Sequence, residues 1–571
     1  MFAPAPKQKN SPVNLTPSES TETLTSDRTA VRSVLIVLTC MMAHIVNSSN
    51  TSAVSVSLPT IGKELDIPED RLHWIVASGP LTTSCFLMMF GRICDLYGRK
   101  KPFLLGSLWM AVFAISLSFA KDDITFDILR GLQGIGRAAM MPAAVGILSD
   151  AFPSSQARRK AFAAFTAGQP LGDALGTVVG GVLTQLTATS WRSPLYLITV
   201  LSLVTFVLGL YAIDSDRPSS ATDQRIDWVG AVLVSTGILL VVFVLSQGEM
   251  APHQWRTPYI IALLLLGLTL IVAFIAWQRY LEQKYDTELS KCCPPPLMRL
   301  SLWTRGNGRV AAAFIIAFLT WCALYSWLYW AQLYYQNYMG LAPLATVTRL
   351  LPAYLTGVLY NVTATILLSR VPLVYLMVSG NILNAIASLL FALINPASAY
   401  FAFGFPAAAL APAGAGFVYA CTMIYVTKVV RPHEQGVVGA VVQTMTQLGS
   451  SLGVTLSTVI SDQVSGGPTH SQRRPSSLES YKTAEWTNLA FAALGVIEKR
   501  HSGCEKEESE FASDCRDVHS DGVLWYGRKD TGDMENVFSH RSILICSESD
   551  RDLRTRRHRL QEIPNRLISG K

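Results

Sequence analysis

Long apolar stretches alternate with short polar segments along most of the chain. A bilayer hydrocarbon core about 30 Å thick requires roughly 20 apolar residues of α-helix. By this measure the pattern predicts thirteen full membrane-spanning helices, and therefore an all-α polytopic membrane protein. The predicted spans cover residues 33–61, 72–91, 102–120, 124–148, 161–187, 194–213, 228–247, 257–278, 309–338, 344–368, 371–394, 399–427 and 436–460.

A fourteenth apolar segment begins at Trp486 and ends at Ile497, where Glu498, Lys499 and Arg500 follow directly. This segment has about 12 residues, which is shorter than a membrane helix requires. We therefore expect a truncated fourteenth span.

Charged residues are scarce for a chain of this length. They make up 15% of the 571 residues, against about 25% in an average soluble protein. The 47 Lys and Arg against 40 Asp and Glu give a formal net charge of +7. So few charges cannot cover the surface of a soluble multidomain enzyme, so the composition supports an integral membrane protein.

The basic residues of the loops recur on one predicted side of the membrane, with Arg473 and Arg474 as the exception. The positive-inside rule makes that side the cytosol and places the N-terminus there. We expect the plasma membrane, with the vacuolar membrane as the alternative. Because these charges are spread over short loops, we expect no nucleic-acid partner. The cytosolic loops include Arg92, Arg99, Lys100, Lys101, Arg158, Arg159, Lys160, Arg279, Lys284, Arg370, Lys428 and Arg431.

Both termini are hydrophilic. Residues 1–30 are rich in Ser, Thr and Pro without an apolar core, which indicates a disordered cytosolic tail rather than a cleaved signal peptide. Residues 498–571 show no sustained amphipathic period, and we expect disorder there too. This second tail is either a genuine regulatory segment or the product of a frameshift or retained intron.

The chain offers little enzymatic chemistry. Most of the ten cysteines lie inside apolar runs, where a thiol behaves as a small hydrophobic group. The spans contain no Ser/His/Asp set and no metal-ligand cluster. We therefore expect no enzymatic activity, no metal and no cofactor.

The loop after the second span, Gly91-Arg-Ile-Cys-Asp-Leu-Tyr-Gly-Arg-Lys-Lys, carries the first specific motif. Gly91 and Gly98 permit a tight turn and a close approach of helices. The loop resembles the signature loop of the major facilitator superfamily. The resemblance implies a cytosolic latch that includes Arg99 and Lys100. In this latch Asp95 accepts from the next bundle's backbone or pairs with an arginine.

The fourth span contains Arg130-Gly-Leu-Gln-Gly-Ile-Gly, which is similar to a second element of that superfamily. An arginine at this depth is costly unless it is paired or hydrated, so Arg130 is a candidate cavity residue.

Small residues form a ridge on the fifth span. Gly168, Gly172, Gly176 and Gly180 recur every four residues and are followed by Gly181. This spacing lets two helices touch backbone to backbone. The ridge resembles the antiporter motif of drug-exporting facilitators, although the Gly-Pro pair usual before the final glycines is absent. The alternative is plain small-residue packing.

The first span contains Asn50-Thr-Ser-Ala-Val-Ser-Val-Ser-Leu-Pro-Thr-Ile, similar to an element of the fourteen-span drug:proton antiporter branch. Asn50 stands where that branch has an acid. Together with the Trp-Ile-Val run from Trp74 and the Arg-Leu-Leu-Pro run from Arg349, this most resembles the fungal aminotriazole-resistance type of multidrug exporter. The resemblance covers about residues 31–497.

The resemblance implies two six-helix bundles with an extra helix pair between them. The expected organisation is an N-terminal tail (1–30), a first bundle (31–213), an inserted pair (214–280), a cytosolic linker (281–308), a second bundle (309–497) and a hydrophilic tail (498–571).

Two charges lie near the middle of neighbouring spans, Arg137 in the fourth and Asp173 in the fifth. These spans run in opposite directions, so both charges lie at one depth, and an isolated buried charge is unfavourable by several kcal/mol. We expect an Arg137–Asp173 ion pair lining the cavity. Asp173 would then replace the acid missing at Asn50 as the protonatable group. Alternatively the pair is purely structural, or Arg137 faces cavity water.

Aromatic residues crowd the ninth span. Trp321, Tyr325 and Tyr329 are four residues apart, a stripe that could stack on a flat or cationic substrate. For the end at Tyr334 to Tyr338 we favour an interfacial belt.

The resemblance implies a transporter that exports small organic compounds, such as drugs, toxins or secondary metabolites. Two bundles would expose a central cavity alternately to each side, with protons as the coupling ion, and we expect a monomer. The alternatives are a solute-specific uptake facilitator, or an inactive or sensor-type truncated facilitator.

Overall fold

The computed structural model divides the chain into two units, Met1–Cys504 and Glu505–Lys571, and all described residues belong to the first. The predicted C-terminal tail, 498–571, and all of the predicted N-terminal tail except Ala30 lie outside the described residues. The structure describes residues 30–68, 71–152, 155–216, 225–248, 251, 253–286, 294–305, 308–368, 370–429, 435–464 and 478–497.

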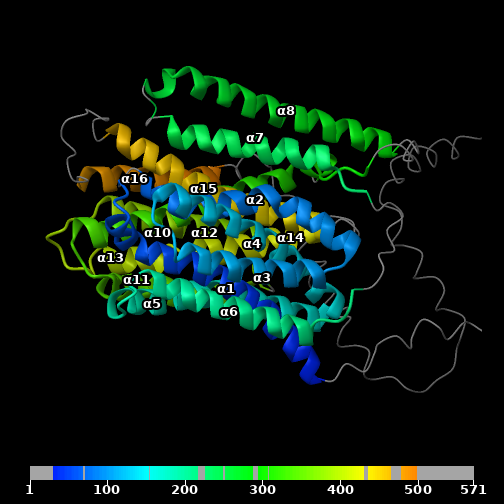
Figure 1. Ribbon diagram of the computed structural model, residues 1–571, viewed down its shortest axis with the longest axis horizontal. Coiled ribbons are helices and arrows are strands. Elements are labelled where there is room, and N and C mark those ends of the chain that lie inside the picture. The colour runs from blue at the N-terminus through cyan, green and yellow to red at the C-terminus, as the bar shows by residue number, and fades with distance from the viewer. Residues whose placement is uncertain are drawn as a thin grey trace, which may run out of the picture. The chain divides into compact units, whose positions relative to one another are not determined.

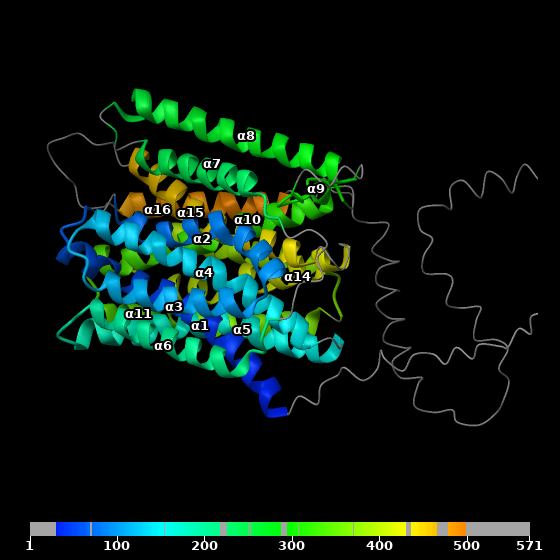
Figure 2. The same ribbon diagram turned by 45° about the vertical axis from the view of Figure 1, so that its right-hand side comes forward.

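Every regular element of the described residues is a helix (Figures 1 and 2). The first six long helices correspond to the first six predicted spans, and the next two correspond to the inserted pair. Their bounds are α1 (Ala30–Glu64), α2 (Leu72–Tyr97), α3 (Lys100–Leu117), α4 (Asp123–Ala151), α5 (Ser155–Leu186), α6 (Arg192–Ala212), α7 (Trp228–Gln247) and α8 (Pro258–Asp286), with a 3₁₀ turn, η3 (Gln254–Arg256), before the last.

The second half of the chain begins with a short linker helix and continues with long helices. Their bounds are α9 (Ser301–Thr304), α10 (Arg309–Leu333), the π-helical turn η4 (Tyr334–Tyr338), α11 (Pro343–Leu367), α12 (Leu373–Ala392), α13 (Gly404–Leu410), α14 (Ala413–Val429), α15 (Gln435–Val464) and α16 (Leu478–Ile497).

Ten helical segments of the described residues are long and apolar enough to cross a membrane. Three other predicted spans, α4, α5 and α15, have 29, 32 and 30 residues and are long enough to cross, but contain more polar side chains. Several of those polar groups line the cavity described below. The ten segments are α1, α2, α3, α6, α7, α8, α10 with η4, α11, α12, and α13 with α14.

The last helix begins earlier than its apolar pattern predicted. Helix α16 has 20 residues and starts at Leu478 rather than at Trp486. Glu479, Lys482 and Glu485 interrupt the apolar run in this first part. Tertiary packing overrides that pattern, because α16 lies against α10, α12 and α15.

The predicted span at 399–427 is divided into two helices. Helix α13 ends at Leu410 and α14 begins at Ala413. Pro412 lies between them, and a proline has no backbone N–H with which to continue the helical hydrogen bonds.

The long helices outside the inserted pair fall into two sets with matching neighbours. In the first set, α1 packs against α5 and α6, and α3 packs against α4 and α6. In the second set, α10 packs against α15 and α16, and α12 packs against α14 and α16. The two sets meet through α2 against α15 and through α5 against α11.

Helices α7 and α8 lie along one side of these sets, with α8 outermost (Figures 1 and 2). Helix α7 contacts α8, α2 and α15. Asp227 caps the N-terminus of α7. Its carboxylate accepts hydrogen bonds from two side chains of α8, Trp277 Nε1 at 2.9 Å and Gln278 Nε2 at 2.6 Å. The linker is attached to α8 as well, because the backbone N–H of Met298 donates to Gln278 Oε1 at 3.1 Å.

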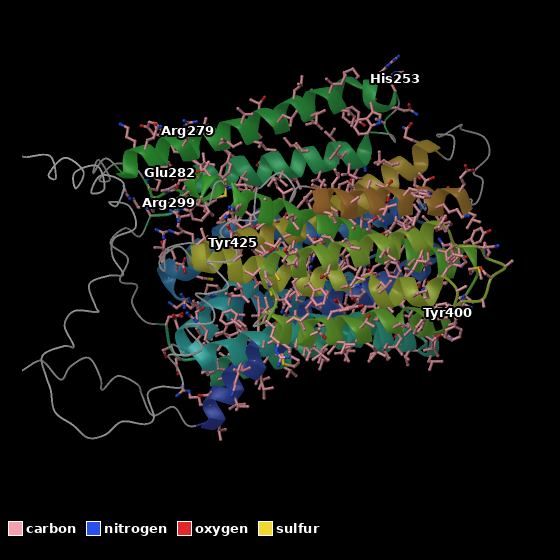
Figure 3. All side chains as sticks on the ribbon, turned by 180° about the vertical axis from the view of Figure 1, so that it is seen from behind. His253, Arg279, Glu282, Arg299, Tyr400 and Tyr425 are labelled. Atoms are coloured by element: carbon pink, nitrogen blue, oxygen red, sulfur yellow. The ribbon has the colours of Figure 1, made fainter. Side chains whose placement is uncertain are left out.

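The two ends of the helices carry different groups. Figure 3 shows Arg279, Glu282 and Arg299 at the end opposite to Tyr400. The first end holds the loops predicted to be cytosolic. Ion pairs connect the helices at this end (Arg32–Asp214, Arg99–Asp150) and at the other end (Arg71–Asp123, Arg192–Glu64).

Candidate functional site

Two adjoining cavities lie where the helix sets meet. They share Gln169 of α5, Trp321 and Tyr325 of α10, and Tyr419 of α14. The space not filled by atoms is about 420 Å³ in the first cavity and about 630 Å³ in the second. Because both helix sets contribute to each wall, a relative movement of the sets would change access to both cavities.

The first cavity is polar. Helix α1 contributes a stripe of polar side chains at helical spacing. Helix α15 contributes two glutamines, and their spacing of four residues places both on one face of that helix. The polar lining consists of His44, Asn47, Ser48, Thr51, Arg137, Gln169, Gln443, Thr446 and Gln447.

The second cavity combines one carboxylate with aromatic and small apolar groups. Asp173 is its acidic residue. Tyr354 of α11 joins the shared aromatic rings, and Gly357 of the same helix also lines the cavity. Asn361 of the same helix also lines this cavity.

The predicted Arg137–Asp173 ion pair is wrong for this conformation. Arg137 Nη2 donates to Thr51 Oγ1 at 3.0 Å, and Asp173 Oδ1 accepts from Ser52 Oγ at 2.7 Å. Two adjacent residues of α1 therefore hold the two charges separately. Equal depth on antiparallel spans does not determine the partners of these two residues, because hydroxyl groups of α1 lie beside both and form the hydrogen bonds.

Arg130 and Asn50 form a separate buried cluster with Gln133. Arg130 Nη1 donates to Gln133 Oε1 at 2.8 Å, and Asn50 Nδ2 donates to the same oxygen at 3.0 Å. Arg130 also reaches the carbonyl oxygen of Ile75 at 3.4 Å. Neither Arg130 nor Asn50 lines the two cavities. The cluster joins α1, α2 and α4, so its observed contacts are structural.

The signature loop makes its hydrogen bonds and ion pairs mainly within the first helix set. Arg99 Nη1 donates to the carbonyl oxygen of Gly146 at 2.6 Å and pairs with Asp150, while Asp95 lies 3.8 Å from Arg99 Nη2. Pairing with an arginine was one of the two expectations for Asp95, and it is observed. Gly91 faces the second set, because a Cβ there would lie 3.4 Å from Cβ of Ala440 on α15.

Asp216, which the sequence did not indicate, completes this loop. Its carboxylate accepts from the backbone N–H groups of Arg99 and Lys100, both at 2.7 Å, and of Lys101 at 3.2 Å. Gly98 has φ +94°, and a Cβ there would clash with Asp216. The segment that leaves α6 is thus anchored on the N-terminus of α3.

The glycine ridge of α5 lies against α1. A Cβ at Gly168 would lie 2.9 Å from the carbonyl oxygen of Met41, and one at Gly172 would lie 2.5 Å from that of Ile45. Gly176 and Gly180 continue the same contact along α1. Gly181 points elsewhere, toward Val347 of α11, so it belongs to the interface between the helix sets.

Only part of the predicted aromatic stripe reaches the cavities. Trp321 and Tyr325 line both of them, and Trp321 lies beside Tyr419 with ring centroids 5.6 Å apart. Tyr329 lines neither and instead packs edge-on against Trp330 in the hydrophobic core. Tyr329 lies one helical turn beyond Tyr325, which places its side chain outside the cavities.

The predicted interfacial belt is wrong for two of its tyrosines. Tyr334 and Tyr335 are each only 2% exposed and pack edge-on against Phe391 of α12. Tyr338 is 39% exposed and fits the prediction better. The π-helical turn at this point changes which residues face inward, and helical periodicity cannot anticipate it.

Several cavity residues were absent from the sequence prediction. His44, Gln169, Gln443, Gln447 and Tyr419 all line the first cavity. The available signal was their polarity inside apolar spans, which marks side chains that face a bundle interior. Motif matching did not single them out.

Known proteins match this chain in sequence over most of its length. The efflux pump terJ of Aspergillus terreus is 26% identical over 475 residues, covering 81% of this chain and 86% of that protein. The aminotriazole resistance protein of Saccharomyces cerevisiae is 24% identical over 469 residues, covering 81% and 82%. The low affinity ammonium transporter of the same yeast is 26% identical over 438 residues, covering 75% and 80%.

The family comparison covers both helix sets. The sequence model described as "Major Facilitator Superfamily" matches residues 40–248 and 220–454. The expected resemblance to aminotriazole-resistance and efflux proteins is confirmed by the relatives, and the all-helical polytopic fold agrees with it. The chain is therefore an integral membrane transporter that belongs to the major facilitator superfamily.

Proposed function

We propose that this transporter exports small organic compounds through the two adjoining cavities, with protons as the coupling ion. The single observation that carries the proposal is the position of Asp173. It is the acidic residue in the wall of the larger cavity, among aromatic rings. A group of this kind can bind either a proton or a cationic part of a substrate, and competition between the two would couple their movements.

The hydrogen bonds around Asp173 support a role in coupling. Ser52 donates to its carboxylate, while Arg137 is held by the neighbouring residue Thr51. Protonation would remove the negative charge of Asp173 that the Ser52 hydroxyl stabilises. Because both contacts run through α1, the protonation state of one carboxylate would then affect the position of that helix.

The walls of the larger cavity support a small organic substrate. Trp321, Tyr325, Tyr354 and Tyr419 present aromatic surface. Aromatic faces attract flat and cationic groups, so we expect compounds of that kind among the substrates.

We assign the alternating movement to the two helix sets, α1–α6 and α10–α16, with α7 and α8 as the inserted pair. The orientation we propose follows the basic loops, which places the N-terminus and the Arg279 end of the helices in the cytosol. We also propose a plasma-membrane location and a monomer.

The test is transport by the purified full chain in vesicles of defined internal pH, with a fluorescent organic cation as substrate. We expect accumulation driven by a proton gradient and abolished by a protonophore. Asp173→Asn should abolish proton-driven accumulation while leaving substrate exchange. Asp123→Asn is the control, because Asp123 pairs with Arg71 far from the cavities. Unchanged gradient dependence in Asp173→Asn would contradict Asp173 as the coupling group.

The polar first cavity favours a second candidate function, uptake of a hydrophilic solute. Arg137 and three glutamines offer hydrogen bonds that an apolar drug would not use. The same vesicles distinguish the two functions, because an uptake facilitator moves hydrophilic solute down its own gradient and does not accumulate the organic cation. An inactive or sensor-type facilitator would show no flux of either compound.

A further inference from the structure

Helix α16 carries a fully buried carboxylate. Glu485 and Asn488 are both 0% exposed, and Asn488 Nδ2 donates to Glu485 Oε2 at 3.2 Å. Glu485 Oε1 and Asn488 Oδ1 have no hydrogen-bond partner among the described residues. A buried ionised carboxylate with so few partners is strongly unfavourable, so a positive charge must neutralise it.

Helix α12, which packs against α16, carries further buried polar groups without partners. Ser388 and Asn384 are 0% exposed, and neither the Ser388 hydroxyl nor the Asn384 amide has a hydrogen-bond partner among the described residues. A Cβ at Gly495 of α16 would lie 3.4 Å from Asn381 Nδ2 of α12. This contact fixes the register of the two helices at one end.

An aromatic layer fixes the register at the other end. The Tyr334 ring of α10 lies 5.3 Å from Phe391 of α12 and 5.8 Å from Tyr481 of α16. The start of α16 is therefore near the end of α12, so the two helices are antiparallel. Counting seven residues from the Asn381–Gly495 contact along each helix brings Ser388 level with Asn488.

The Glu485 carboxylate therefore lies between the Asn381–Gly495 contact and the aromatic layer around Tyr481. Trp327 of α10 closes this layer against Phe391, and its Nε1 also has no hydrogen-bond partner among the described residues. Glu485 follows Tyr481 by four residues, which puts both on one face of α16. The side chains without partners thus come from all three helices.

Among the described residues, the neighbouring helices supply no cation for Glu485. Within the described residues Glu485 forms no ion pair within 4.0 Å. The other charged groups of α16 are Glu479 and Lys482, nearer its start. There Ser461 Oγ of α15 donates to the carbonyl oxygen of Ser480, which puts the neighbouring Asp462 at this end as well. The titratable groups of α10 and α12 are tyrosines and Cys322, apart from Arg309 at the start of α10.

We propose that Glu485, Asn488 and Ser388 form a binding site for a small monovalent cation in the second helix set. The occupant is either a proton on Glu485 or an Na⁺ ion among carboxylate, amide and hydroxyl oxygens, which are the ligands that such hard cations prefer. None of the three residues lines the central cavities. The site thus goes beyond the proposed export function, and its occupancy can be measured without any transport.

The test is the thermal unfolding of the purified full chain in detergent, from pH 5 to pH 9, in NaCl and in choline chloride. For Na⁺ we expect the melting temperature to rise by several degrees in NaCl. For a proton we expect it to fall as the pH rises, equally in both salts. Glu485→Gln should remove either dependence, because the neutral amide needs no cation. Glu479→Gln is the matched control, because Glu479 is an exposed carboxylate on the same helix. This variant should keep the dependence on Na⁺ or pH that the wild type shows.

Two further measurements keep the proposal testable if Glu485→Gln does not fold. Ser388→Ala removes a ligand oxygen but keeps the carboxylate, so it should weaken ²²Na⁺ binding severalfold if Na⁺ is the occupant. If a proton is the occupant, the wild-type chain should bind no ²²Na⁺ and should show an infrared carboxylic-acid band at neutral pH. Wild-type protein with neither signal, or a Glu485→Gln variant that keeps the wild-type dependence, would overturn the site. Failure of efflux alone would count against the proposed function and leave the site intact.

Discussion

Gln336 in the π-helical turn donates a hydrogen bond from Nε2 to the carbonyl oxygen of Val56 on α1, at 3.0 Å. This bond joins the two helix sets near the end opposite to the basic loops. A second bond at the same end runs from the backbone N–H of Leu344 to Gln185 Oε1, also at 3.0 Å. Both bonds must break if the sets separate at this end, which makes them candidates for an outer lock.

We predict that Gln336→Ala shifts the conformational equilibrium toward a state open at that end. A hydrogen bond of this kind contributes about 0.5–1.5 kcal/mol, which corresponds to a shift of up to roughly tenfold. The measurement is the distance between spin labels placed on the outer ends of α1 and α11. Thr348→Ala is the control, because its hydroxyl bonds within its own helix, to the carbonyl oxygen of Ala345. Equal distance distributions in all three proteins would show that Gln336 is not part of a lock.

Substitution of the glycine ridge should destabilise the first helix set. In Gly172→Ala the new methyl group would lie 2.5 Å from the Ile45 carbonyl oxygen and 2.8 Å from Ser48 Cβ. Overpacking of this kind costs about 1–3 kcal/mol. We expect a lower melting temperature in detergent and reduced transport.

The control for the ridge is Gly439→Ala on α15, where the nearest atom to the new methyl group would be 3.9 Å away. Alanine is favoured over glycine in a helix by about 1 kcal/mol, so this variant should be at least as stable as the wild type. If both variants melted alike, close packing on α1 would not explain the spacing of these glycines.

The sequence predicted those features of the fold that depend on span length and helical period. The ridge spacing from Gly168 to Gly180 and the cavity positions of Trp321 and Tyr325 follow from counting residues along a helix. The long apolar runs likewise located the helices, because a membrane requires that length.

Features that depend on neighbours from distant segments could not be predicted in this way. Arg137 and Asp173 both lie beside α1, but Arg137 donates to Thr51 and Asp173 accepts from Ser52, so they do not pair with each other. Asp216 is invisible as a motif, because its partners are backbone N–H groups more than a hundred residues away. Local pattern does not determine such contacts.

Loss of the Asp216 contact should loosen the signature loop. The carboxylate accepts from the first backbone N–H groups of α3, and such a cap contributes about 0.5–2 kcal/mol. We expect Asp216→Ala to lower the melting temperature by about 1–3 °C. Gly98→Ala should do the same from the other side of the contact, because its methyl group would displace the carboxylate and φ +94° disfavours alanine.

Asp214→Ala is the matched control for that change. Asp214 pairs with Arg32 at 2.5 Å, but both side chains are partly exposed, and such surface pairs contribute at most about 1 kcal/mol. Its melting temperature should stay close to that of the wild type. If Asp214→Ala lowered the melting temperature more than Asp216→Ala did, net charge rather than capping of α3 would stabilise this region.

The aromatic residues of α10 allow substrate contact to be separated from packing. Tyr325→Ala removes a ring that lines both cavities, so it should change the relative transport of different organic cations by about five- to thirtyfold, since a ring contact contributes about 1–2 kcal/mol. Tyr329→Ala removes a ring buried against Trp330 and should lower stability without changing those ratios. The measurement is the apparent affinity for a panel of cations, together with the melting temperature of each variant. Identical selectivity changes in both variants would mean that α10 acts through its overall packing, and the cavity would then need to be assigned to other helices.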